Sequence, residues 1–185
     1  EKANFNYDDI ELQLEDIMRH VTYYFPDFKS TPIVTVISDV NYRQKIIPTS
    51  NQLIVAIDTY LGKEHELYSG INKYQRENLN IQQLPADAAL SYASLFVEPT
   101  MDRTLLGSMI YHGKLHYLQE LFAPKSTGDQ IFSYSPEKYQ FTVENEDQMW
   151  QYFIEKELLY DSDSQLLSRF ILPAPFSKFY LEVDQ

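Results

Sequence analysis

The chain has 185 residues, a formal net charge of −12 and no cysteine. This length supports one well-buried core, so we expect a single domain spanning residues 1–185, and an apolar content of 44% argues against disorder. The lack of cysteine excludes disulfides, thiolate metal sites and a cysteine nucleophile within this chain, and the absence of clustered lysine and arginine argues against nucleic-acid binding.

The first predicted element is an amphipathic helix over residues 8–28. Its apolar residues recur at steps of three and four, the spacing of one helix face: Ile10, Leu14, Ile17, Val21 and Tyr24. Asp8 or Asp9 is suited to cap the helix start, and Pro26 ends the element. A stripe this regular is typical of a helix that packs on a core.

Two runs rich in β-branched residues follow, at 31–39 and 51–58, and both are predicted strands. Because they are close in sequence, we expect them to pair antiparallel in a small sheet. The segment between them predicts a third strand, which Pro48 confines to a sheet edge. Residues 59–84 are polar and aperiodic, which indicates a long loop with short helical turns at most.

The second half of the chain is predicted to be helical. We expect helices at 85–98, 99–124, 135–160 and 161–170, the third of them capped by Ser135 and broken near Glu144–Asn145. Residues 171–185 are expected to be an extended tail. The order of one helix, a small sheet and several helices predicts an α+β fold, mainly helical with a small antiparallel sheet.

The helix at about 101–122 is expected to be central. Its broad apolar stripe predicts a buried set: Leu106, Met109, Ile110, Tyr117 and Leu121. Glycine inside a helix is costly unless a neighbour must approach closely, so Gly113 predicts a tight crossing by the helix at 86–97. Lys114 is expected to point to solvent or to an acidic partner.

Two histidines, His112 and His116, stand four residues apart on this helix, at the spacing of a zinc-protease motif. The glutamate that would follow the first histidine and act as general base is missing, since Gly113 stands there. Both histidines lie on or beside the apolar stripe, where hydrogen-bonded core histidines are more common than metal ligands. We therefore predict no catalytic, cofactor-binding or metal-binding residues, and no cofactor.

The remaining patterns are weaker. His65-Glu66 lies in a loop without a second histidine, and the five glycines form no phosphate-binding loop. The aspartates of DSDSQLLSRF, residues 161–170, lack the glycine and the final glutamate of a calcium loop, which indicates helix capping.

Four stretches in this order resemble the gliding-motility lipoprotein family GldB of the Bacteroidetes: IVAIDTYLG (54–62), MIYHGKLHYLQELFAP (109–124), MWQYFIEKELLYDSD (149–163) and RFILPAPFSKFYLEVDQ (169–185). The resemblance covers nearly the whole chain. It implies a lipoprotein anchored to a membrane through an N-terminal cysteine that this chain lacks, and family members continue past residue 185 with a further helix. We therefore expect the chain to be a fragment.

A more distant similarity links the element order to predicted zinc-dependent proteases with a zincin-like fold. Their HExxH helix would correspond to ALSYASLF, residues 89–96, which contains no histidine. His112-Gly113 would then take the place of the Glu-Gly pair on the next helix. This similarity implies a degenerate zincin-like fold that has lost its zinc ligands.

The family resemblance implies a function. We expect a non-catalytic lipoprotein domain of the cell envelope that faces the periplasm and acts as a structural or interaction component of the gliding and protein-secretion machinery. Its partners would be envelope proteins of that machinery and, through the lipid anchor, a membrane. One alternative is a divergent zinc metallohydrolase that uses His112 and His116. A second alternative, suggested only by the aromatic content and the expected compartment, is a peptidoglycan- or glycan-binding module.

Overall fold

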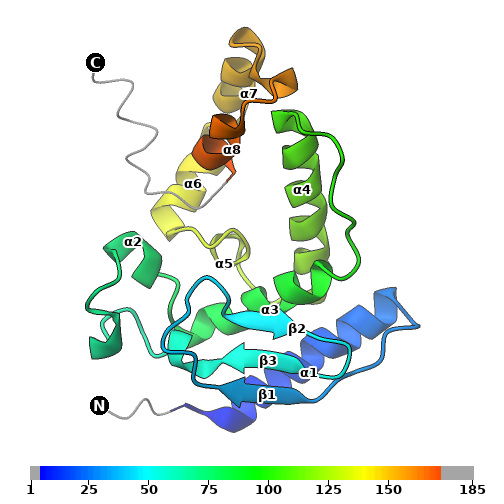
Figure 1. Ribbon diagram of the computed structural model, residues 1–185, viewed down its shortest axis with the longest axis vertical. Coiled ribbons are helices and arrows are strands. Elements are labelled where there is room, and N and C mark those ends of the chain that lie inside the picture. The colour runs from blue at the N-terminus through cyan, green and yellow to red at the C-terminus, as the bar shows by residue number, and fades with distance from the viewer. Residues whose placement is uncertain (1–4, 172–185) are drawn as a thin grey trace.

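The computed structural model describes residues 5–171 (Figure 1). Eight α-helices and three strands are found in this part of the chain: α1 Tyr7–Tyr24, β1 Ile33–Val36, β2 Ile46–Pro48, β3 Leu53–Ala56, α2 Lys73–Arg76, α3 Leu84–Ala93, α4 Leu105–Phe122, α5 Gly128–Ile131, α6 Pro136–Glu144, α7 Glu146–Glu155 and α8 Ser164–Phe170. Short 3-10 turns lie between them: η1 Ile57–Thr59, η2 Glu66–Tyr68, η3 Ile81–Gln83 and η4 Leu158–Tyr160. The predicted α+β class is confirmed, and the predicted tail lies almost entirely outside the described residues.

The sheet is mixed, which corrects the prediction of an antiparallel sheet. Its strand order is β1-β3-β2, with β3 parallel to β1 and antiparallel to β2. The turn at 49–52 reverses the chain, so β3 forms a hairpin with β2 and runs in the direction of β1. β3 takes the centre because Leu53 and Val55 are the most deeply buried strand residues, and β2 stays at the edge, as Pro48 predicts.

The core lies between the sheet and two helices on one of its faces. Figure 1 shows α1 and α3 behind the sheet. The predicted stripe of α1 is largely confirmed, since Leu14, Ile17 and Val21 are buried while Tyr24 remains 43% exposed. The predicted cap at Asp8 or Asp9 is wrong, because Asn6, two residues before Asp8, caps the helix and accepts a hydrogen bond from Asp9 N. Several aromatic rings close the core at the other end of α1: Phe25, Phe28, Tyr92, Phe96 and Phe122.

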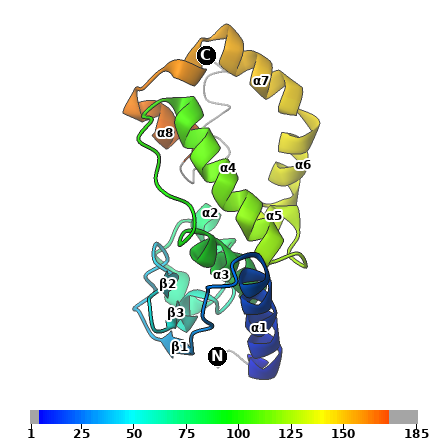
Figure 2. The same cartoon turned by 90° about the vertical axis from the view of Figure 1, so that its right-hand side faces the viewer.

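The helices after α5 form a separate arc above this core (Figure 2). α6 and α7 lead away from α4, and η4 and α8 return to it, with Leu105 N donating to Asp161 O. The predicted break is confirmed, because Asn145 separates α6 from α7, and Ser135 caps α6 as expected. Asp163 caps α8, which confirms the prediction that the aspartates of residues 161–170 serve in helix capping. Neither α6 nor α7 has a buried residue. None of the described helices is long and apolar enough to cross a membrane.

α4 is central, but the predicted buried face is wrong. Ile110 is 50% exposed and Tyr117 is 64% exposed, and Leu106, Met109 and Leu121 are only partly buried. The face that packs on α1 and α3 includes Leu115, Gln119 and Phe122, whereas Leu105 is buried at the other end of α4, where its backbone N donates to Asp161 O. Apolar residues occur on both sides of α4, so its sequence pattern is compatible with two orientations of the helix. The side that is buried contains the polar Gln119, and a polar residue normally indicates an exposed side.

The predicted tight crossing over Gly113 is also wrong. A Cβ atom at Gly113 would have no neighbour within 4 Å, and the residue is exposed, as is Lys114. The close approach to α4 occurs instead at the buried Gly107, where an added Cβ atom would lie 2.5 Å from Cγ of Asp102. α3 does pack on α4, but through Leu115 and Gln119 on the opposite side of the helix.

Candidate functional site

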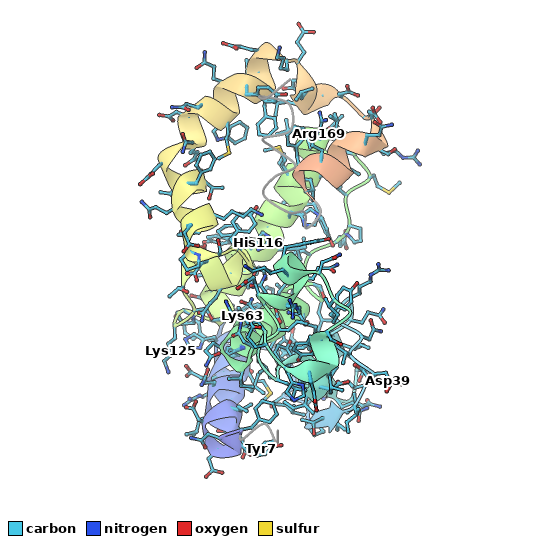
Figure 3. All side chains as sticks on the ribbon, turned by 90° about the vertical axis from the view of Figure 1, so that its left-hand side faces the viewer. Tyr7, Asp39, Lys63, His116, Lys125 and Arg169 are labelled. Carbon is cyan, nitrogen blue, oxygen red and sulfur yellow. The ribbon has the colours of Figure 1, made fainter. Side chains whose placement is uncertain are left out.

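His112 and His116 are both partly buried on α4, and His116 lies near the junction of the core with the upper arc (Figure 3). His116 packs against Phe132 with the two rings tilted and their centroids 4.8 Å apart, and its Nδ1 lies 2.9 Å from Oε1 of Gln119. Since the Gln119 amide nitrogen donates to Ala86 O, its oxygen must accept from His116 Nδ1. One ring nitrogen of His116 is therefore committed to a structural hydrogen bond.

His112 sits at the edge of the same region. Its ring meets Tyr111 edge-on at 5.2 Å, and burial lowers the pKa of His112, with a smaller contribution from the neighbouring His116. A zinc site needs three or four ligands, and no group of three histidine, aspartate or glutamate side chains placed to hold a metal occurs in residues 5–171. In residues 5–171, the two histidines four residues apart on α4 therefore lack a third ligand.

A second candidate is buried Asp58, which follows β3. Its carboxylate accepts hydrogen bonds from Ser38 N at 2.9 Å and from Val40 N at 2.8 Å, and from the Ser38 hydroxyl. Asp39 and Val40 have φ angles of 54° and 58°, a left-handed conformation that is strained for a β-branched residue. The carboxylate therefore holds a strained loop in place. This use leaves it with a structural role.

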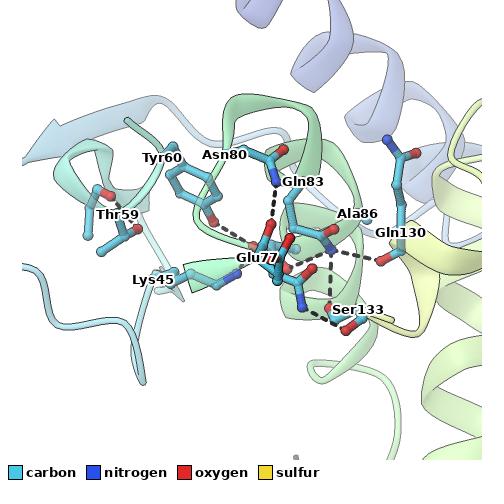
Figure 4. Close-up of polar contacts among 12 residues, drawn as sticks. Lys45, Thr59, Tyr60, Glu77, Asn80, Gln83, Ala86, Gln130 and Ser133 are labelled. Carbon is cyan, nitrogen blue, oxygen red and sulfur yellow. Dashed lines mark hydrogen bonds and ion pairs between the residues drawn. The ribbon is translucent and has the colours of Figure 1, made fainter. Parts of the chain in front are cut away.

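Lys45, Tyr60 and Asp87 form a buried polar cluster between β2 and α3 (Figure 4). Tyr60, 1% exposed, donates to Asp87 Oδ2 at 2.8 Å, and the Lys45 ammonium forms an ion pair with the same carboxylate. Burial, together with the Asp87 charge, raises the pKa of Tyr60 well above its usual value. Every polar group of the cluster has a partner within it.

Gln83 extends this cluster toward α5. Its amide nitrogen donates to Gln130 O at 2.7 Å and contacts Asp87 and Ser133 (Figure 4). A shallow pocket of about 320 Å³ opens beside it, lined mainly by amide and carboxylate side chains together with Tyr134. The arrangement can hold water or a small polar molecule.

The sequence analysis does not predict this network. Two local signals of buried charge could have indicated part of it: Asp58, two residues after a buried strand, and Asp87, in an alanine-rich helix. The ion pair between Lys45 and Asp87 could not be predicted, because the two residues are far apart in sequence and only the fold brings them together.

The exposed side of α4 is the remaining candidate, and it is a surface. We call it the α4 outer face and define it by Ile110, Gly113, Lys114 and Tyr117. These positions are three, four or seven residues apart and project from one side of the helix. Ile110 and Tyr117 are 50% and 64% exposed, and Gly113 leaves the helix backbone uncovered between them. None of the four belongs to the core formed by the part of the chain that the structure describes.

Comparison with known proteins identifies the family. A family model described as gliding motility protein GldB matches residues 1–185, the whole chain. No curated protein and no solved structure gives a significant match, so the similarity to zincin-like folds stays a prediction.

Proposed function

Because the chain belongs to the family of gliding motility protein GldB, we propose that it is a non-catalytic component of the gliding machinery that works by binding other proteins. The name of the family model marks its members as lipoproteins. We accordingly place the domain at the cell envelope, facing the periplasm and held to a membrane by an N-terminal lipid. Its partners are envelope proteins of the motility and associated secretion machinery.

The observation that carries this proposal is the α4 outer face. Aromatic and aliphatic side chains that the core does not use are typical of protein–protein contacts, where a few such residues supply most of the binding energy. Gly113 adds a flat site at which a partner can approach the helix backbone. A helix glycine that neither packs nor turns the chain costs stability, and binding gives it a reason to be there.

The state of the buried ionisable groups supports a role without catalysis. Asp58 is occupied by the backbone amides of the 38–40 loop, and Asp87 is occupied by Lys45 and Tyr60. Catalytic groups usually face a cavity with hydrogen-bonding positions that other protein groups do not occupy, and they lie beside a residue that activates them. In the described residues, the histidine pair of the metallohydrolase alternative lacks a third ligand.

A double variant, Ile110→Ser with Tyr117→Ser, tests the proposal in the full-length lipoprotein. We expect the melting temperature to stay unchanged, since both side chains are exposed, while cell gliding and the recovery of envelope proteins in a pull-down are lost. The matched control is Tyr23→Ser with Ile37→Ser, which removes the same two residue types at sites 78% and 82% exposed elsewhere on the domain. Gliding that survives the α4 variant and is lost in the control would overturn the assignment of the surface.

A further inference from the structure

The shallow polar pocket of about 320 Å³ is built from two segments that are far apart in the sequence. It is lined by residues from 77–83 and from 129–136. Side-chain amides join the two segments: Asn78 Nδ2 donates to Ser133 O at 2.6 Å. Gln83 Nε2 likewise donates to Gln130 O at 2.7 Å (Figure 4). Because these bonds hold the two segments together, a ligand would meet a site that is already formed.

The amide side chains of this pocket turn their nitrogens toward oxygens of the protein. Gln83 is 3% exposed, and its Nε2 has three acceptors within 3.3 Å, more than its two N–H groups can serve. Asn78 and Asn80 each direct Nδ2 at a backbone oxygen, at 2.6 Å and 2.9 Å. In a planar amide the oxygen points away from the nitrogen. The amide oxygens are therefore the groups that these side chains mainly offer to a ligand.

Carboxylates add further acceptors to the pocket. Glu77 binds the Lys63 ammonium at 2.9 Å, whereas the partly buried Asp129 forms no ion pair within residues 5–171. The Lys138 ammonium lies 3.8 Å from the centre of the Tyr134 ring, so this cation already has a place beside the pocket. The Tyr134 hydroxyl can donate, but ionised carboxylates and amide oxygens only accept. Acceptors thus predominate among the groups that line the pocket.

We propose that this pocket binds a guanidinium or ammonium group, the groups that arginine and lysine side chains carry. Both groups donate several hydrogen bonds and accept none, which matches a site of amide oxygens and carboxylates. The net charge of −12 attracts cations to the domain. Sugar hydroxyls donate and accept alike, so they match the pocket less well. The pocket shares no residue with the α4 outer face, so binding here can be present or absent whatever the outcome for the proposed function.

Titration of the isotope-labelled chain, followed by NMR, tests this proposal. The probes are the blocked amino acids Nα-acetyl-arginine methylamide and Nα-acetyl-lysine methylamide. We expect both to shift the side-chain NH₂ signals of Asn78, Asn80 and Gln83. The matched citrulline compound has nearly the same shape as the arginine compound without its charge, and it should leave these signals unchanged. Methylguanidinium distinguishes the sources of the group: weaker binding than the arginine compound indicates a polypeptide side chain, and equal or tighter binding indicates a free cation.

A charge variant locates the binding in this pocket. Asp129→Asn should weaken binding of the arginine compound about fivefold, the upper range for an exposed ion pair. The control Asp147→Asn makes the same charge change on the exposed side of α7 and should leave the affinity unchanged. The comparison of probes uses the parent chain, so it remains informative if a variant does not fold.

Two results would overturn the proposal. One is that neither cationic amino acid shifts the signals of Asn78, Asn80 and Gln83. The other is that the citrulline compound or N-acetylglucosamine shifts them equally, because the pocket would then be a site for neutral polar ligands.

Discussion

The side-chain amide of Gln119 donates a hydrogen bond of 2.9 Å to the backbone oxygen of Ala86 and so joins α4 to α3 inside the core. Gln119 is 1% exposed, and its amide oxygen accepts from His116. The central helix is thus held in its orientation by a polar contact among apolar ones. A buried amide is costly unless it is fully bonded, so this contact makes the observed orientation specific.

Replacing this side chain should destabilise the domain. We expect Gln119→Ala to lower the free energy of unfolding by about 2 kcal/mol, because it removes a buried hydrogen bond and leaves a cavity. Urea unfolding measures the change. Glu120→Ala, at the exposed neighbouring position, is the control and should change the free energy by less than about 0.5 kcal/mol. Equal stability of the two variants would contradict the described interface of α3 and α4.

The two glycines of α4 should respond to alanine in opposite directions. Gly113→Ala should raise the free energy of unfolding by about 0.5–1 kcal/mol, because the site is open and alanine favours the helix. Gly107→Ala should lower it by about 1–3 kcal/mol, because the new Cβ would collide with the Asp102 side chain. Melting curves of both variants provide the comparison. If Gly113→Ala destabilised the domain instead, the result would contradict the structure and support the predicted tight crossing over Gly113.

The buried Tyr60 should make the domain sensitive to alkaline pH. Its pKa is raised in the folded state, so the folded chain holds the proton more tightly than the unfolded chain does. This contribution to stability is fully present below the unfolded pKa of about 10 and is lost as the pH rises through the folded pKa. Urea unfolding over this pH range measures the loss.

Tyr60→Phe isolates the part that comes from Tyr60. The variant should lose about 1 kcal/mol near neutral pH, where the bond to Asp87 is intact, and should lose less of its remaining stability at high pH than the parent chain. Burial also raises the pKa values of Tyr68, Tyr92 and the partly buried Tyr134, so some alkaline sensitivity should remain. Identical pH profiles of variant and parent would show that Tyr60 ionises without cost.

Zinc analysis distinguishes the proposed function from the metallohydrolase alternative. We expect the purified chain, dialysed against zinc and then buffer, to retain far less than one zinc ion per molecule, since the described residues supply two ligands at most in this region. The double variant His112→Ala, His116→Ala serves as the reference. Stoichiometric zinc in the parent chain that disappears in this variant would establish a metal site and overturn the non-catalytic reading.

Local features of this protein are determined by its sequence. The break at Asn145, the caps at Ser135 and Asp163, and the edge position of Pro48 depend on hydrogen bonds and steric limits within a few residues, so they could be predicted. The stripe of α1 belongs to the same class, because its buried residues Leu14, Ile17 and Val21 recur at steps of three and four along the helix. The whole-chain family likeness is likewise a property of the sequence.

The tertiary structure decided the features that depend on distant partners. α4 has apolar residues on two sides, and only its packing on α1 and α3 selected the side with Leu115, Gln119 and Phe122 and left Ile110 and Tyr117 exposed. The parallel pairing of β1 with β3 depends on which strand takes the sheet centre, a choice set by burial against helices elsewhere in the chain. The cluster of Lys45, Tyr60 and Asp87 exists only once the sheet and α3 meet, because favourable contacts between residues far apart in sequence leave no local pattern.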